Sequence, residues 1–192
     1  MPVANPAALE FLLSRRSRPA KTLQAPWPSR DDLMPILTAA ARCPDHGKLE
    51  PWRFIVLEKA ALTRLAGLAE TRGDALGYDD EKVEKGRAQF RDGGLAVVVV
   101  ESPVASDKVP DIEQTYSAGA VCLSLLNAAL ASGWGANWLS GWPSHDRVFV
   151  SEGLGLADHE RVAGIIHIGT ESAAPPERPR PDLDAKTSWM SQ

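Results

Sequence analysis

The chain has 192 residues, of which 44% are hydrophobic and 24% charged, values typical of a globular protein with one core rather than two. A net charge of −4 excludes a general nucleic-acid binder, which needs a basic face. Two cysteines cannot build a disulfide framework, and the most apolar run, residues 97–100, is far shorter than the roughly 20 residues of a membrane-spanning helix. We therefore expect a soluble protein of the reducing cytoplasm, with a single domain over residues 1–192.

The first predicted element is a short amphipathic helix. It begins at Asn5-Pro6, an N-cap followed by a proline, and ends at Arg15-Arg16. Three prolines and no periodicity predict a loop over residues 17–28. Ser29-Arg30-Asp31-Asp32 is typical of a capping box and predicts a second helix. Because Pro35 lies inside that helix, we expect a kink or a later start.

Two predicted strands frame the middle of the chain, one over residues 52–57 and one over residues 95–101. The second is a continuous β-branched run, which indicates a fully buried central strand. Between them, leucines at helical spacing predict a helix that ends near Gly73, and residues 78–91 form a charge-dense segment that we interpret as a solvated helix. Residues 112–132, rich in small side chains, are expected to form the longest and most buried helix.

The last third of the chain is predicted to contain two more strands. Residues 135–141 indicate a short strand that enters a glycine-bearing turn, and residues 161–168 a last buried strand. Residues 144–147 cap a helix between them, and Gly153-Leu154-Gly155 ends it; this pair of glycines lacks the third glycine of a dinucleotide fingerprint. From about residue 170 the proline-rich chain should run extended over a surface.

Chemically active residue types are concentrated in residues 42–57, where a polar loop lies between a helix and a strand. Asp45-His46 suggests a hydrolase triad, but the sequence has no Gly-x-Ser-x-Gly elbow, and adjacent loop residues diverge. The four histidines lack the spacing of a metal site, so no metal is expected. The remaining residues that could bind a ligand or take part in a reaction are mainly cations, namely Arg15, Arg16, Arg42, His46, Lys48, Arg178 and Arg180.

These cations, together with the aromatic and small residues 138–141, suit a flavin nucleotide. A phosphate favours the fixed fork of donors on arginine, and a ring system favours an apolar slot with a few donors at its edge. A flavin also carries its own redox chemistry, so no catalytic acid or base is required of the protein.

Three separated motifs give the chain a family resemblance. The segment Cys43-Pro44-Asp45-His46-Gly47-Lys48-Leu49-Glu50-Pro51-Trp52-Arg53-Phe54, with Arg15-Arg16-Ser17 upstream and Trp138-Leu139-Ser140-Gly141 downstream, resembles the FMN-dependent nitroreductase family, in particular its short bacterial YdjA-like branch. The resemblance implies an α+β fold with a central antiparallel-rich mixed sheet flanked by helices. It also implies an intertwined homodimer with FMN at the subunit interface.

The resemblance assigns FMN-binding roles to three groups of residues. Arg15, Arg16 and Ser17 match the N-terminal motif that holds the phosphate and part of the ring edge. Arg42 and His46 match positions that reach the cofactor from the partner subunit. Trp138, Leu139 and Ser140 match the segment beside the isoalloxazine. Asp45, His46 and Lys48 stand where serines and an asparagine are common in the family. Arg178 and Arg180 resemble a late basic pair that many members bring to the phosphate.

The implied function is an FMN-dependent NAD(P)H oxidoreductase of the nitroreductase type. Hydride would pass from NAD(P)H to FMN and then to a nitroaromatic, a quinone or a similar small acceptor, in a ping-pong reaction with no catalytic side chain. One alternative is an FMN-binding protein with little turnover, for flavin storage, delivery or regulation. Another is a flavin-free hydrolase that depends on Asp45-His46. Neither a membrane nor a nucleic acid is an expected partner.

Overall fold

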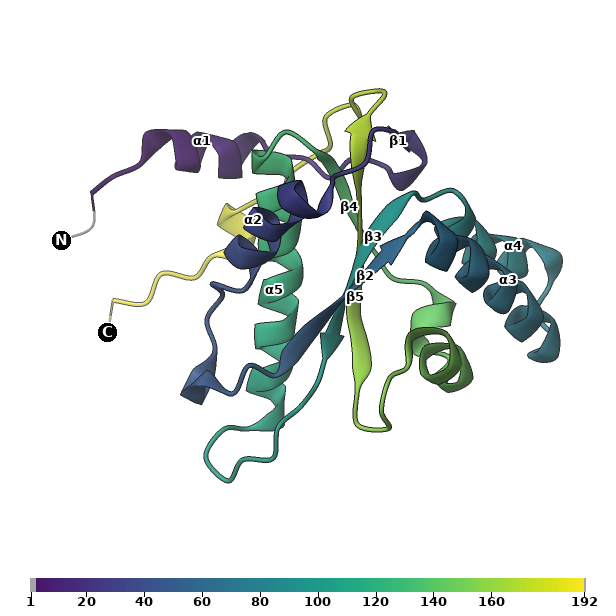
Figure 1. Cartoon of the computed structure of the whole chain (residues 1–192). Helices are drawn as coiled ribbons and strands as arrows, with labels where there is room; N and C mark the ends of the chain where they lie inside the picture. Colours follow the sequence, from purple (N-terminus) through teal and green to yellow (C-terminus); the bar gives the residue numbers. More distant parts are fainter. Residues whose placement is uncertain (1–2, 192) are drawn as a thin grey trace.

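A five-stranded sheet lies between two layers of helices in the computed structural model, which describes residues 3–191 (Figure 1). Met1, Pro2 and Gln192, which belong to the predicted 1–192 domain, lie outside the described residues. The helices are α1 (Pro6–Ser14), α2 (Arg30–Ala40), α3 (Lys59–Ala75), α4 (Asp80–Arg91) and α5 (Asp111–Ala131). The strands are β1 (Leu23–Gln24), β2 (Trp52–Glu58), β3 (Leu95–Glu101), β4 (Gly135–Leu139) and β5 (Arg161–Glu171).

The strand order is β1-β5-β3-β2, and β4 also pairs with β5, off this path. Every strand pair recorded among the described residues is antiparallel, which confirms the predicted α+β class with an antiparallel-rich sheet. All seven residues of β3 are buried, as expected for the central strand. β5 extends three residues beyond its predicted end because Thr170 and Glu171 pair with β1, a strand that lies inside the predicted loop.

The alternating faces of the sheet build two separate cores. One face packs against α3, α4 and the short π-helical turn η4 (Phe149–Gly153) around Phe90, Phe149 and Ile165. The other packs against α2 and α5 around Ile36, Leu125 and Ile166. α5 has 21 residues and eight buried positions, so the expectation of a long, buried helix is confirmed.

The start of α1 agrees with the prediction, but its packing does not. Asn5 Oδ1 accepts a hydrogen bond from the backbone N–H of Ala8, and Pro6 occupies the first helical position. Leu9, Leu12 and Leu13 were expected to form the apolar stripe of an amphipathic helix, yet they are 59%, 56% and 73% exposed. α1 projects from the molecule at its N-terminal end (Figure 1), and residues 3–191 leave these side chains largely exposed.

The capping box of α2 is present, with Ser29 Oγ accepting from Asp32 N at 3.2 Å and the Asp32 carboxylate accepting from Ser29 N at 2.9 Å. The helix begins at Arg30 and passes through Pro35, so the predicted later start is wrong. Pro35 is tolerated because Leu33, Ile36 and Ala40 bury one side of the helix on the sheet, which outweighs one missing hydrogen bond.

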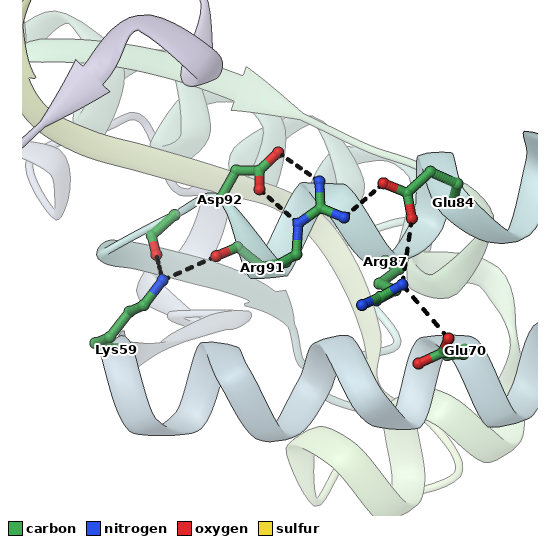
Figure 2. A network of polar contacts seen from close by, with 7 residues as sticks. Lys59, Glu70, Glu84, Arg87, Arg91 and Asp92 are labelled. Atoms are coloured by element: carbon green, nitrogen blue, oxygen red, sulfur yellow. Dashed lines mark hydrogen bonds and ion pairs between the residues drawn. The ribbon is translucent and has the colours of Figure 1, made fainter.

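The charged segment 78–91 forms α4, and its interpretation as a wholly solvated helix is wrong for one face. Val83 and Phe90 are buried against α3 and the sheet. The other face carries the expected charges, and it is tied to α3: Lys59 Nζ donates to Arg91 O and Gly93 O at 2.8 and 2.9 Å (Figure 2). A lysine amine at the C-terminal end of a helix also interacts favourably with the helix dipole.

Among the residues that the structure describes, none of the helices is both long enough and apolar enough to span a membrane.

Candidate functional site

The first predicted motif, Arg15-Arg16-Ser17, lies where α1 ends and the chain turns along the sheet. Arg15 leaves the helical conformation with φ −56° and ψ 141°. Three residues later, the backbone N–H of Arg18 donates to Ala136 O on β4 at 2.8 Å. This bond ties the arginine loop to β4. The side chains of the loop therefore share a wall with the predicted motif that begins at Trp138.

The C-terminal tail supplies the opposite wall. Beyond β5 the chain passes close to the arginine loop, and Arg16 Nη1 donates to Pro176 O at 2.6 Å. The start of the proline-rich tail therefore lies against its own subunit. The walls enclose an open cavity of about 630 Å³, lined by Arg15, Arg16, Ser17, Pro19, Asn137, Trp138, Pro175, Pro176, Arg178 and Arg180.

The cavity is strongly electropositive because four of its lining residues are arginines. Burial, and then the neighbouring charges of Arg180, Arg16 and Arg18, lower the pKa of Arg15. Arg15 Nη2 donates to Ser17 Oγ at 3.1 Å, whereas its buried Nε has no hydrogen-bond partner within residues 3–191. A buried donor without an acceptor costs stability, so this arrangement favours an anionic ligand that would accept from it.

Trp138 provides an aromatic surface beside these cations. It belongs to β4, pairs with Ile166 on β5 and is 37% exposed. A Cβ atom at Gly164 would lie 2.2 Å from Trp138 Nε1, so only glycine at that position allows the indole to lie on the β5 backbone. The structure therefore places a half-exposed ring next to four guanidinium groups, a combination that suits a ligand with a flat ring and an anionic end.

Leu139 and Ser140, the other two residues of this motif, do not line the cavity. Leu139 ends β4 opposite Ile165, and Ser140 follows as an exposed residue whose Oγ lies 3.2 Å from His145 Nε2. Of the motif, only Trp138 is brought together with Arg15, Arg16 and Ser17 by the fold of one chain.

Arg42 and His46 lie in another part of the molecule. Arg42 is exposed just beyond α2, and His46 begins the 3₁₀ turn η2 (His46–Lys48), where its Nδ1 is 2.5 Å from Glu113 Oε2 near the start of α5. The arginine loop instead borders Leu130, near the end of α5. At 1.5 Å per residue, Glu113 and Leu130 are about 25 Å apart along the helix. One chain therefore cannot bring His46 to the arginine cavity.

The loop around His46 does not form a hydrolase triad. Asp45 Oδ2 accepts from the backbone N–H of Glu50 at 2.7 Å and so points away from its neighbour His46. Lys48 and Glu50 have φ angles of 54° and 49°, a left-handed conformation that is strained for residues other than glycine. Within residues 3–191, the His46 side chain hydrogen-bonds to Glu113 and to no serine. Ser117 lines the same pocket, but its Oγ donates to Pro44 O.

No group of three histidine, cysteine, aspartate or glutamate side chains in the described part of the chain is placed to hold a metal ion. His167 is buried on β5 between Leu62 and Gly93, and burial lowers its pKa to about 4. It is therefore neutral at pH 7 and belongs to the core.

Sequence reasoning missed Asn137, Pro175, Pro176 and Glu177. Asn137 precedes the recognised Trp138 motif by one residue, so its place on β4 was a usable signal. The tail residues gave no such signal, because their place in the site depends on the contact with Arg16, 160 positions away in the sequence.

The sequence and the fold of the chain are similar to those of known proteins. The model of the Nitroreductase family matches residues 12–170. The chain is 36% identical to YdjA of Escherichia coli (strain K12), by name a candidate NAD(P)H nitroreductase, over 94% of this chain and 92% of YdjA. A nitroreductase with bound FMN from Bacteroides fragilis NCTC 9343 has a TM-score of 0.74 at 21% identity, covering 98% of this chain and 100% of that chain. The nitroreductase-like protein of Bacillus cereus has a TM-score of 0.78 at 23% identity, covering both chains fully. The chain belongs to the nitroreductase family.

Proposed function

We propose that the protein is an FMN-dependent NAD(P)H oxidoreductase of the cytoplasm that reduces small acceptors such as nitroaromatics or quinones. The observation that carries this proposal is the cavity in which four arginines and the Trp138 ring meet. Its volume of about 630 Å³ lies within the usual range for cofactor sites. The names of its relatives and the FMN bound by a structural neighbour support the same reading.

The residues present fit a flavin mononucleotide. Arg15 Nε is a buried donor with no acceptor in the described part of the chain, and Arg16 is 13% exposed, so both are positioned for a phosphate rather than for bulk solvent. Trp138 on Gly164 offers a flat surface for an aromatic ring. A phosphate monoester joined to a ring system satisfies both features at once, whereas an inorganic anion satisfies only the first.

When bound, FMN would supply the hydride transfer between NAD(P)H and the acceptor. The chain's own residues would bind and orient this cofactor. Arg15 and Arg16 hold the anionic end at fixed guanidinium forks, and Ser17 Oγ, which accepts from Arg15, fixes the direction of that side chain. Trp138 covers the backbone of β5 and keeps water from that side of the ring. The positive charge of the cavity also favours the reduced, more negative form of a bound cofactor.

The working unit in this proposal is a homodimer with two shared sites. α5 exposes Ile112, Tyr116 and Leu123, which are 52%, 67% and 46% accessible and lie on one face of the helix. Leu183, Trp189 and Met190 of the tail are also exposed, although Pro176 of the same tail contacts its own chain. Large apolar side chains gathered on one face of a helix are typical of a subunit interface.

An antiparallel pairing of α5 with its copy would complete the site. A two-fold axis across this face places the first turn of one helix beside the last turn of the other. His46, bound to Glu113 at the start of α5, would then approach the partner's arginine cavity, which lies at the end of α5. Arg42 would approach from the same side, while Leu139 and Ser140 extend the β4 wall towards the ring.

Flavin content tests the proposed function. Protein purified after growth without added flavin should be yellow, should bind FMN with one site per chain, and should bleach when NADPH or NADH is added without oxygen. A yellow protein that stays yellow with both nucleotides would indicate the alternative, an FMN-binding protein with little turnover. A colourless protein that takes up no FMN would refute both.

Mixed dimers test the shared site. We expect Arg16→Ala and Arg42→Ala homodimers each to bind FMN weakly, because every site in them lacks one arginine. A heterodimer of the two variants has one site with both arginines and one with neither, so it should bind one FMN tightly. FMN stoichiometry on purified heterodimer measures this, with light scattering of the wild type beside it. A monomer that binds FMN fully, or a heterodimer without a tight site, would refute the model.

A further inference from the structure

The tail places a carboxylate of its own between two arginines of the cavity. Glu177 Oε1 is 2.7 Å from Arg180 Nη2 and 3.4 Å from Arg16 Nη1. The backbone N–H of Arg178, and then the charges of Arg180 and Arg16, lower the pKa of Glu177, so it is ionised at neutral pH. Its side chain is 67% exposed, which leaves it free to swing into solvent without breaking any packing.

The wall of the cavity does not depend on this carboxylate. Arg16 also donates to Pro176 O at 2.6 Å, and that bond holds the tail whether or not Glu177 is in place. Glu177 is therefore a side chain that neutralises part of the cavity's charge while contributing little to its shape. Four lining arginines face this single paired carboxylate, so a net positive charge remains even when it is engaged.

We propose that Glu177 is a resident competitor for the phosphate site, and that it selects for ligands with a doubly charged phosphate. This inference rests on the proposed function. A phosphate dianion brings more charge than one carboxylate and offers more acceptor atoms to Arg16 and Arg180, so it displaces Glu177. A flavin without phosphate has nothing to offer these arginines, and the pair with Glu177 stays intact.

Removal of the competitor should increase affinity for phosphate ligands alone. Glu177→Gln keeps the size and most of the polarity of the side chain but removes its charge. Because Glu177 is exposed, water screens its charge, and for charges about 4 Å apart in water we expect FMN and inorganic phosphate to bind roughly three- to tenfold more tightly than to the wild type. Riboflavin, which has the ring without the phosphate, should bind both proteins equally. The gain should shrink as ionic strength rises, because salt screens exposed charges.

Asp182→Asn is the matched control. It removes the same charge from the same tail, but within residues 3–191 the Asp182 carboxylate accepts hydrogen bonds from the backbone N–H groups of Asp184 and Ala185 and pairs with no arginine. Titration calorimetry with FMN, riboflavin and inorganic phosphate on the full chain measures all three proteins, and thermal melting confirms that each is folded. The expected result is a gain for phosphate and FMN in Glu177→Gln and no change in Asp182→Asn.

Three outcomes would overturn the inference. Equal or weaker phosphate binding by Glu177→Gln means that the carboxylate orients the arginines rather than competing. An equal gain in Asp182→Asn means that only overall charge matters, and an equal gain for riboflavin means that the tail has opened. Failure of the wild type to bind FMN, together with tighter phosphate binding by Glu177→Gln, would refute the proposed function and leave this inference standing.

Discussion

The arginines of the sheet and the arginines of the cavity differ in how their charges are balanced. Arg161 donates to both oxygens of Glu101 at 2.5 and 2.7 Å, and Arg53 donates to both oxygens of Glu160 at 2.7 Å. The carboxylates are buried, with side-chain exposures of 3% and 7%. Each of these arginines therefore has one carboxylate of its own, held in bidentate geometry.

Around the cavity lie four arginines, Arg15, Arg16, Arg178 and Arg180, and among the described residues one carboxylate, the exposed one of Glu177, forms ion pairs with them, namely with Arg16 and Arg180. The comparison shows that a matched arginine–carboxylate pair contributes to folding, whereas a surplus of arginines at a cavity is available to a ligand. Substitutions in the first region should change stability and leave binding unchanged. Substitutions around the cavity should change binding and leave stability unchanged.

The largest effect is expected from Arg161→Ala. It leaves the Glu101 carboxylate buried with Thr115 as its remaining side-chain donor, so the free energy of unfolding should fall by about 3 kcal/mol. Urea denaturation measures this. Arg91→Ala is the control, because Arg91 pairs with Glu84 and Asp92 at the exposed surface, where an ion pair contributes much less to stability. Equal losses in the two variants would contradict the distinction between buried and exposed pairs.

Arg16→Ala should produce the opposite pattern. The loss of a charge-assisted contact to phosphate should weaken FMN binding by about 1.5 to 3 kcal/mol, roughly ten- to a hundredfold. The melting temperature of the protein without FMN should barely change. Flavin fluorescence titration decides this, with Arg161→Ala as the binding control. An unaltered dissociation constant in Arg16→Ala would remove that residue from the site.

Acid should weaken the stabilisation that the matched pairs provide. The guanidinium of Arg53, and then the backbone N–H of Ala157, lower the pKa of Glu160 to about 2. Because this folded pKa is below the unfolded value, the stabilisation is complete above about pH 4.5 and is lost as pH falls towards 2. Its size should be on the order of 2 kcal/mol. Stability of Arg53→Gln measured by urea denaturation from pH 6 to pH 3 should fall less steeply than that of the wild type; parallel curves would argue against this role.

The smallest effect is expected from Arg180→Ala. Its side chain is 53% exposed and is paired with Glu177, so its loss also frees that carboxylate from one partner. FMN binding should weaken by about 1 kcal/mol, roughly fivefold, less than in Arg16→Ala. FMN titrations of Arg180→Ala and Arg16→Ala in the same buffer show which residue contributes more to binding. A larger loss in Arg180→Ala would place the phosphate nearer to the tail than to the arginine loop.

Local signals predicted much of the fold and part of the site. The capping box at Ser29 and the β-branched run of β3 act within a few residues, so the sequence shows them directly. The N-terminal arginines and Trp138 were likewise found from their motifs. α1 was assigned an amphipathic role that its exposed leucines do not fulfil in one chain, because a periodic pattern predicts a buried face without saying what covers it.

By itself, the sequence determined the α+β class, the central strand, the long small-residue helix and the supply of cations near an aromatic segment. Tertiary structure decided which cations meet. Arg16, Trp138 and Arg180 are far apart in the chain and come together only because β4 pairs with β5 and the tail returns to the arginine loop. His46 is separated from them by the length of α5. Such long-range contacts depend on packing across the whole chain, which residue types and spacing alone do not encode in a readable way.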